Sequence, residues 1–320
     1  LGVIAGVQEA PPQWTIHAEA KPGKDRTPEV PVVIFSDWHF GEVVAPAAVD
    51  GFNAYSPEIA EERARRLVES VVRLCRRSGP GTYPGIVVAL LGDFISGGLH
   101  PELAKTDGEE RIPSMLRCRD ILVWAIDRLA AEFGQVYVPC AAGNHGRETD
   151  KPEFKRYVYK NFDWLIYQLL RRAFAGRSDV VIDVPEANEV HFRVFGLRFL
   201  GLHGDMMGVK GGDGIIGAIG PIMRGEIKVR GQVSTLGRDY DIALMGHWHQ
   251  ELWLPRAFVN NTLKGFDEYA KNKLRAPPTS PAQSLFFVHP RRGITSRWSV
   301  RVDSGDYAPA PWVSWQEAVA

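Results

Sequence analysis

The chain has 320 residues, of which 45% are hydrophobic and 24% are charged, a composition that fits an ordinary soluble globular protein. The charges of its 38 basic and 38 acidic residues cancel, so no global positive field attracts nucleic acid. A net charge of zero does not exclude a local basic groove. No run approaches the roughly 20 apolar residues that a membrane-spanning helix needs, so we expect no membrane partner.

Three widely spaced cysteines, Cys75, Cys118 and Cys140, form no CxxC unit and lie in apolar runs. We therefore expect buried free thiols, which suit a reducing compartment better than secretion. The first residues also lack the basic start and long apolar core of a signal peptide. Together these features predict a cytoplasmic protein.

Regular structure is expected to begin after a polar, proline-bearing N-terminal tail or arm at residues 1–30. Short β-branched runs predict buried strands in the first half of a single domain; they lie at 30–37, 85–93 and 135–144. Amphipathic helices are predicted to alternate with these strands; they lie at 56–79, 114–134 and 163–176. Ser56 and Asp163 are placed as N-caps, and Gly134 as a helix stop.

Strands dominate the second half of the domain, which we expect to span residues 31–305. The predicted elements are a hairpin at 189–205, a strand at 239–248 and a terminal pair at 284–290 and 296–304. A glycine-rich stretch at about 206–231 predicts an active-site loop, and residues 306–320 a C-terminal tail. This order of elements indicates an α/β core whose second half completes a sheet layer.

Metal-capable side chains follow four of the buried strands and the hairpin. They are Asp37 and His39, Asp93, Asn144 and His145, His203, and finally His247 and His249. In open α/β sheets ligands bind beyond the carboxyl ends of strands, so these side chains should converge. Residues two apart in extended backbone project to the same side, so Asp37 and His39 can grip one ion. His247 and His249 can address two neighbouring ions about 3.5–4 Å apart.

These blocks, in this order, resemble the metal-binding motifs of the calcineurin-like metallophosphoesterases. The matching segments are Asp37-Trp38-His39, Gly92-Asp93, Gly143-Asn144-His145, His203 and Gly246-His247-Trp248-His249. The resemblance implies a four-layered α/β/β/α sandwich and a metal-dependent phosphoesterase that hydrolyses its substrate with a hydroxide bridging two divalent ions. Mixed carboxylate, imidazole and amide ligands favour manganese, with iron, zinc or nickel as alternatives.

The resemblance also implies a role for each residue. The first metal site corresponds to Asp37, His39, Asp93 and His249. The second corresponds to Asp93, Asn144, His203 and His247, with Asp93 bridging the two ions. His145 resembles the histidine that protonates the leaving oxygen or steadies the transition state. Asp205 could orient His203, and a structural turn role is the equal alternative.

Departures from the family pattern narrow the range of candidate substrates. The segments "GDFISGG" and "GNHGR" differ from those of the Ser/Thr protein phosphatases. Arg147 stands close behind His145 and is expected to meet a substrate phosphate, with a structural salt bridge as the alternative. The opening "SDWHFGE" and the ending "GHWH" are most similar to the nuclease and phosphodiesterase branch, which includes phosphoesterases encoded by bacteriophages.

We therefore expect a phosphodiester substrate, with DNA among the candidates, in a bacterial or phage-infected host cytoplasm. A phosphomonoesterase acting on a small molecule or a nucleic-acid end is the second hypothesis, and a scaffold without chemistry is the third. Both monomer and homodimer remain open. Basic residues that could contact a nucleic-acid backbone, or equally form a solvated loop, are Lys210, Arg224, Lys228 and Arg230. Aromatic residues that could stack bases, or pack in the core, are Trp38, Phe40 and Trp248.

Overall fold

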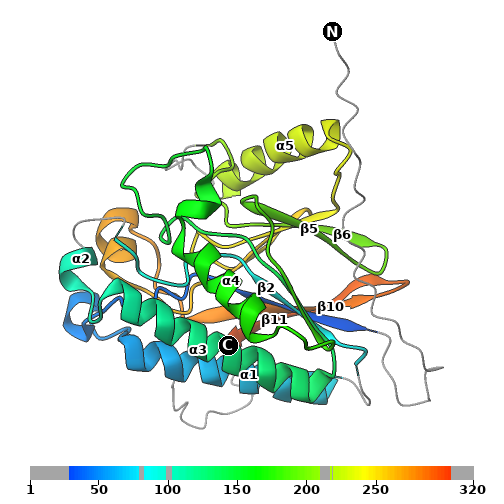
Figure 1. Ribbon diagram of the computed structural model, residues 1–320. Helices are drawn as coiled ribbons and strands as arrows, with labels where there is room; N and C mark the ends of the chain where they lie inside the picture. The colour runs from blue at the N-terminus through cyan, green and yellow to red at the C-terminus, as the bar shows by residue number, and fades with distance from the viewer. Residues whose placement is uncertain (1–28, 79–82, 99–102, 210–216, 218, 304–320) are drawn as a thin grey trace, which may run out of the picture.

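Two β-sheets packed face to face form the centre of the protein (Figure 1). The computed structural model describes residues 29–78, 83–98, 103–209, 217 and 219–303. The predicted tails at 1–30 and 306–320 therefore lie almost wholly outside the described residues. The first sheet has six strands in the order β11-β10-β1-β2-β3-β4. Its strands are β1 Val30–Phe35, β2 Ile86–Leu90, β3 Val136–Pro139, β4 Val180–Asp183, β10 Ala282–His289 and β11 Gly293–Arg301.

The second sheet has five strands in the order β5-β6-β7-β9-β8. They are β5 Glu189–Val194, β6 Leu197–Leu202, β7 Ile242–Met245, β8 Leu252–Trp253 and β9 Ala257–Val259. Strands β1 to β4 run parallel, as do β6, β7 and β9, so their carboxyl ends meet at one edge of the molecule. This edge carries the predicted metal-binding blocks.

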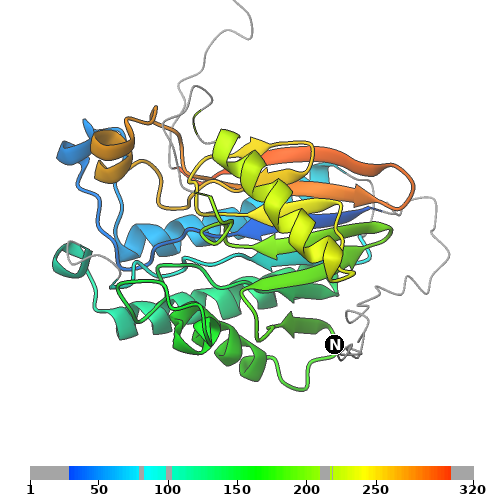
Figure 2. The same cartoon turned by 90° about the horizontal axis from the view of Figure 1, so that it is seen from above.

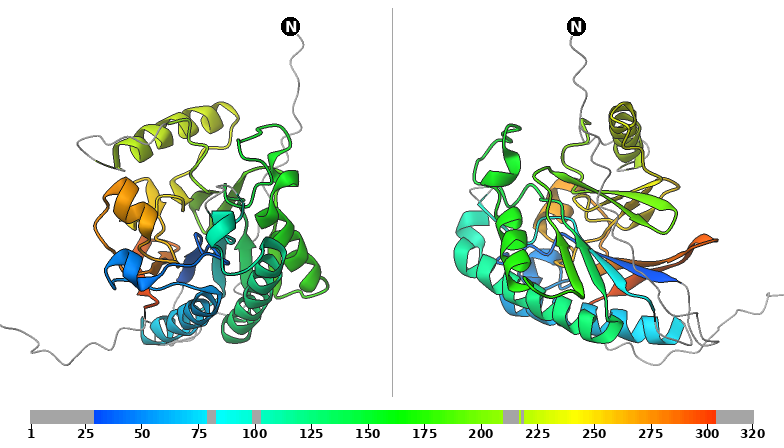
Figure 3. Two further views of the ribbon diagram at one scale, coloured as in Figure 1. Left: turned by 90° about the vertical axis from the view of Figure 1, so that its left-hand side faces the viewer. Right: turned by 45° about the vertical axis from the view of Figure 1, so that its right-hand side comes forward.

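Helices cover both outer faces of the sheet pair, as Figures 2 and 3 show. The first sheet is covered by α1 Pro57–Ser78, α3 Arg111–Phe133 and α4 Phe162–Ala173, and the second by α5 Ile219–Thr235. Shorter turns of helix are η1 Pro46–Val49, α2 Leu103–Thr106, η2 Tyr157–Lys160 and η3 Tyr269–Leu274. The four-layered α/β/β/α sandwich is confirmed.

Strand β1 explains why the layers form. All six of its residues are buried. Val33 and Phe35 pack against the helices, whereas Val32 and Ile34 pack between the two sheets. Successive side chains of a strand point to opposite faces, so a continuous apolar run is stable only where both faces are covered.

The predicted helices and strands of the first half are confirmed, with one correction at a cap. Ser56 Oγ accepts a hydrogen bond from the Ile59 amide at 3.3 Å, and Gly134 ends α3 in the left-handed conformation. Asn161, rather than Asp163, caps α4: its side chain accepts the Asp163 amide at 2.8 Å. The side chain of Asp163 is used elsewhere.

The prediction of a loop at about 206–231 is wrong from Ile219 onward, where α5 begins. Residues 210–216 and 218 lie outside the described part of the chain. Glycine lowers helix propensity, but the buried face of α5, with Ile222 and Val233, packs on the second sheet and offsets that cost. Gly225 is needed for close packing, since a Cβ there would lie 2.8 Å from Met207 Cβ.

The three cysteines are buried and free, as predicted. Among the described helices, none has the length and apolar character needed to cross a membrane.

Candidate metal centre

Six of the predicted ligands form two groups at the carboxyl edge of the sheets. They are Asp37, His39 and His249 in the first cluster, and Asp93, His203 and His247 in the second. Within each cluster the ligand atoms all lie within 4.8 Å of one another. Asn144 joins the second cluster, because its Oδ1 lies 3.1 Å from His203 Nε2. The structure therefore brings together all seven residues predicted as ligands.

The spacing in the first cluster fits one ion. His39 Nε2 lies 3.1 Å from His249 Nε2, which in turn lies 3.4 Å from Asp37 Oδ1. Ligand atoms bound at about 2.1 Å around a tetrahedral or octahedral ion are about 3.0–3.4 Å apart. Burial lowers the pKa of His39 well below its usual value, with the Lys264 ammonium adding to the effect, so the imidazole is neutral. Neutral imidazole nitrogens and a carboxylate suit a divalent cation.

The second cluster has similar spacing around His203. Its Nε2 lies 2.9 Å from Asp93 Oδ2, and its Nδ1 donates to the Leu91 carbonyl at 2.7 Å. Burial alone would lower the pKa of His203, but the Asp93 carboxylate and then that of Asp37 outweigh it and hold the pKa well above its usual value. Burial lowers the pKa of His247 to about 3, and the charge of His203 adds to this. The carboxylates around His203 therefore stabilise a positive charge at this point.

The two clusters adjoin. The His247 amide donates to Asp37 Oδ1 at 2.9 Å, so a ligand of the second cluster holds a ligand of the first. The rings of His39 and His145 lie edge to face at 4.6 Å, and the His145 amide donates to Asp93 Oδ1 at 2.7 Å.

Backbone strain is concentrated at this site. Nine non-glycine residues of the described chain have a positive φ, and five of them are predicted ligands. These five are Asp37, His39, Asp93, His247 and His249. The left-handed conformation costs a non-glycine residue about 1–2 kcal/mol, and such strain typically persists at functional sites. These strained turns follow the ends of the strands and direct the five side chains toward the two clusters.

Glycines beside the ligands allow the loops to approach closely. A Cβ at Gly143 would lie 2.2 Å from Asp93 Oδ1, and one at Gly246 would lie 2.2 Å from Asp37 Oδ2. Any larger residue at either position would displace a carboxylate. This explains physically why glycine precedes Asn144 and His247.

Asp163 is a site residue that the sequence analysis missed. It is fully buried in α4, and its carboxylate accepts hydrogen bonds from the amides of Asp93, Phe94 and Gly143, at 2.9, 3.1 and 2.9 Å. It thus ties the block at Asp93 to the block at Gly143-Asn144. Burial, with the charge of Asp93, raises the pKa of Asp163 to about 6. The spacing alone favoured the cap role, because an acid in the first turn of a helix is common.

His145 is oriented by a main-chain acceptor. Its Nδ1 donates to the Ser96 carbonyl at 2.7 Å. The Ser96 hydroxyl in turn donates to Asp107 Oδ1 at 2.8 Å. Burial lowers the pKa of His145, although the Asp93 carboxylate opposes it.

Arg147 makes contacts other than those expected from the sequence, and His203 has a partner other than Asp205. The guanidinium of Arg147 donates to the carbonyls of Thr149 and Asp150, both at 2.9 Å, and so braces its own loop. Its contact with a substrate phosphate stays a prediction. The Leu91 carbonyl is the hydrogen-bond partner of His203 Nδ1, so Asp205 does not orient the ring through this atom.

The aromatic and basic residues considered above for contact with nucleic acid lie partly in the core and partly at the surface. Trp38 and Phe40 are buried in the core, as the alternative reading expected, and Trp248 is half-buried against the cluster under α5. Arg230 pairs with Glu226 at 2.5 Å, and Lys228 donates to the Gly208 carbonyl at 2.7 Å. Arg224 is exposed, and Lys210 lies outside the described residues.

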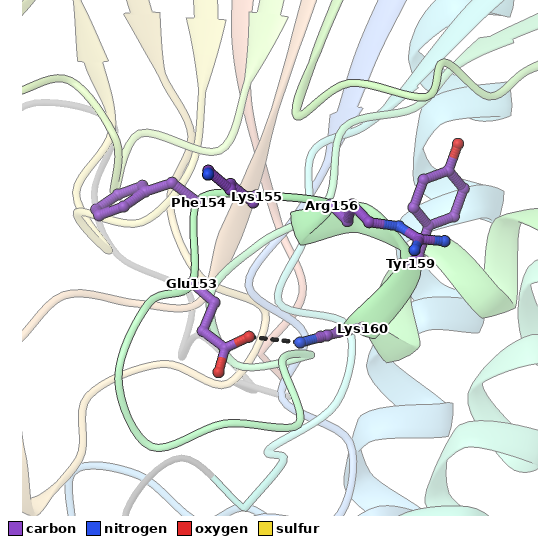
Figure 4. Close-up of a pocket in the computed structure, with 6 residues that line it drawn as sticks. All are labelled: Glu153, Phe154, Lys155, Arg156, Tyr159 and Lys160. Atoms are coloured by element: carbon purple, nitrogen blue, oxygen red, sulfur yellow. Dashed lines mark hydrogen bonds and ion pairs between the residues drawn. The ribbon is translucent and has the colours of Figure 1, made fainter.

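A pocket of about 660 Å³ lies on the loop that follows His145 (Figure 4). Its lining residues are Glu153, Phe154, Lys155, Arg156, Tyr159 and Lys160. Lys160 pairs with Glu153 at 2.5 Å, and the Phe154 ring is 77% exposed. The neighbouring Tyr157 hydroxyl donates to the Gly143 carbonyl at 2.7 Å, which docks this loop directly on the block that carries Asn144.

Comparisons with known proteins add a structural similarity only. No protein-family model matches the sequence, and no curated protein matches it. A 5′-nucleotidase from Staphylococcus aureus is 11% identical, with a TM-score of 0.36 over 88% of this chain and 56% of its own. The sulfate thiohydrolase SoxB from Thermus thermophilus is 12% identical, with a TM-score of 0.34 over 88% of this chain and 58% of its own. A yeast protein serine/threonine phosphatase from Saccharomyces cerevisiae is 11% identical, with a TM-score of 0.32 over 88% and 82% of the two chains. The chain thus spans little more than half the length of the first two.

Proposed function

We propose that the protein is a metal-dependent phosphoesterase that uses two divalent ions. The observation that carries this proposal is the pair of adjoining clusters, each of a size for one ion, built from carboxylate, amide and mostly neutral imidazole groups. Two such ions, when bound, acidify a water and neutralise the charge that develops on phosphoryl oxygens. Manganese is the proposed ion, with iron, zinc or nickel as alternatives.

Different residues are proposed to bind the metal ions, donate a proton and contact the phosphate. Asp37, His39 and His249 would hold one ion and the second cluster the other, and Asp93 would contribute to both. His145 lies beside both clusters with Nδ1 committed to the Ser96 carbonyl. That bond assigns proton transfer to Nε2, which gives a proton to the leaving oxygen from the imidazolium form, in which both ring nitrogens carry a proton. Arg147, in the same loop, contacts a phosphate oxygen after its hydrogen bonds to Thr149 and Asp150 rearrange.

The proposed substrate is a phosphodiester, with DNA among the candidates. Support comes from the pocket of Figure 4, where Arg156 lies over the Tyr159 ring at 5.5 Å and Lys155 follows the exposed Phe154. Phosphates attract such cations, and exposed rings stack on bases. A nuclease similar to those of bacteriophages, acting in the cytoplasm as a monomer or homodimer, is the finer proposal. The alternative is a phosphomonoesterase, which is supported by the net charge of zero.

The test compares bis(p-nitrophenyl) phosphate with p-nitrophenyl phosphate on metal-stripped protein reconstituted with Mn²⁺. Turnover of the diester well above the monoester supports the phosphodiesterase, and single- and double-stranded DNA follow as substrates. Preference for the monoester overturns that choice in favour of a phosphatase. No turnover of either compound or of DNA, with two ions bound, contradicts the enzymatic proposal.

A further inference from the structure

Two buried polar atoms beside the first cluster have no hydrogen-bond partner. They are His39 Nδ1 and Glu42 Oε2, which lie 3.7 Å apart. Both residues are almost inaccessible to solvent, with exposed fractions of 0% and 6%. An unpaired polar atom in such a place costs about 1–3 kcal/mol, so a pair of them facing each other calls for a physical reason.

The turn that follows His39 places Glu42 there. The Glu42 amide donates to the His39 carbonyl at 3.1 Å, which folds the chain back under the histidine. Gly41 makes the turn possible, with a φ of 101°, and a Cβ there would lie 2.8 Å from Ser114 Oγ. The carboxylate of Glu42 is therefore directed to the rear of the His39 ring by a glycine that no larger residue can replace.

The other oxygen of Glu42 is held by a buried lysine. Lys264 Nζ donates to Glu42 Oε1 at 2.8 Å and also to Asp267 Oδ2. Lys264 is 3% exposed, so its charge is stable only because two carboxylates surround it. The flanking carboxylates overcome the effect of burial and hold the pKa of Lys264 above its usual value. Lys264 therefore keeps the carboxyl group of Glu42 close to His39 through Oε1.

The segment that carries Lys264 is itself anchored on the metal-binding loop. The Leu263 amide and the Thr262 hydroxyl both donate to the Asp37 carbonyl, at 3.1 and 2.8 Å. From the other side, Arg63 donates to the Leu263 carbonyl at 3.0 Å. The segment that carries Lys264 is thus fixed beside the His39 loop by contacts that span 200 residues or more of sequence.

We propose that Glu42 is a positioning residue for the first ion, which rests on the metal centre proposed above. Its Oε2 accepts the Nδ1 proton of His39 while His39 Nε2 binds the cation. Metal-binding histidines almost always donate their second ring proton to such an acceptor, which orients the ring and strengthens the ligand. Closing the gap from 3.7 Å to about 2.8 Å requires a shift of about 1 Å, within the reach of a glutamate side chain.

The test measures Mn²⁺ binding to metal-stripped Glu42→Gln by calorimetry. The wild-type protein is expected to bind two ions. The variant is expected to bind one of them about 10–100-fold more weakly, the range seen when such an outer partner of a metal-binding histidine is lost, while the other ion is unaffected. In a His39→Asn background the same change is expected to have no further effect, because Glu42 acts through His39. A purely structural Glu42 would lower affinity equally in both backgrounds, or in neither.

Glu226→Gln is the matched control, because Glu226 is also a buried glutamate paired with a cation but lies in α5. It is expected to leave both affinities unchanged. If Glu42→Gln does not fold, Glu42→Asp serves instead, because it keeps the charge beside Lys264 but shortens the reach toward His39. In Zn²⁺-loaded wild-type protein, NMR should show a downfield His39 Nδ1 proton that either variant shifts upfield.

Unchanged Mn²⁺ affinity and an unchanged proton signal in the variant would overturn the role of Glu42. A wild-type protein that binds no ion would instead contradict the proposed function itself, so the two failures are distinct.

Discussion

The two clusters of the centre are held by different kinds of support. In the first, His39 faces a carboxylate fixed by the buried ions Lys264 and Asp267. In the second, His203 donates to a main-chain carbonyl, and Asp163 ties the ligand loops through three amides. The first arrangement depends on charges brought together from distant segments, and the second mainly on backbone geometry. One sheet edge thus positions two similar clusters of candidate ligands by unrelated means.

The difference has an energetic consequence. Removing one partner of a buried ion pair costs about 3–5 kcal/mol, because the remaining charge is uncompensated. A main-chain acceptor cannot be removed by substitution, so the orientation of His203 should tolerate changes nearby. Substitutions that separate the two kinds of support should therefore differ in their effects, and the largest is expected at the residue that both clusters are proposed to share.

Asp93→Asn is expected to have the largest effect. Asp93 Oδ2 faces His203, and the charge of Asp93 also acts on His39. Loss of this charge should therefore weaken the binding of both ions. Phosphoesterase turnover should fall by a factor on the order of a thousand or more, since the charge-neutralising metals are lost. Metal analysis after dialysis measures how many ions each protein retains, and Asp205→Asn is the control substitution. Retention of both ions would show that Asp93 is not shared.

His145→Asn should separate chemistry from metal binding. Turnover is expected to fall by about 10²–10⁴-fold, the usual contribution of a general acid, while both ions stay bound. Steady-state kinetics with metal analysis on the same sample provides the measurement. Activity within a few-fold of wild type would remove His145 from the proposed mechanism.

Asp163→Ala tests the support of the second cluster. Three buried amides would lose their acceptor, so the free energy of unfolding should fall by about 3 kcal/mol or more. The affinity for the ion of the second cluster should fall more than the affinity for the ion of the first. Denaturant unfolding and Mn²⁺ titration measure the two effects. Ser56→Ala, which removes the side-chain cap of α1, is the control and should cost about 1 kcal/mol and leave metal affinity unchanged.

Asp107→Asn should have the smallest effect, and it should depend on pH. Burial raises the pKa of Asp107 to about 7, and in the unfolded chain the value is about 3.9. A raised pKa in the folded state gives stability that is full below the unfolded value and is lost as the pH rises through about 7. Because this carboxyl is partly exposed, we expect a discounted effect of about 1–2 kcal/mol.

The measurement for Asp107 is the free energy of unfolding of both proteins between pH 4 and pH 8. The wild type should lose stability relative to Asp107→Asn across this range, and the hydrogen bond with Ser96 should persist in the variant because Asn Oδ1 still accepts. A pH-independent difference between the two proteins would contradict a raised pKa.

Much of the fold and of the candidate site was predictable because the signals are local. Continuous apolar runs identified the buried strands, and period 3.6 identified α1, α3 and α4. The metal-capable residues follow the strands directly, so their convergence required only the rule that parallel strands end at one edge. The error at α5 arose because glycine content was weighed above tertiary packing, which stabilises a helix of poor propensity.

The sequence by itself determined most of the elements, with α5 the main exception, and the identity of the seven candidate ligands, since each depends on neighbours within a few residues. Only the tertiary structure decided which groups support those ligands. Asp163 reaches Asp93 across 70 residues, and Lys264 reaches Glu42 across 222. Hydrogen bonds and buried charges act over a few ångströms in space regardless of separation along the chain. No periodicity records such pairings, so they emerge only when the two sheets pack together.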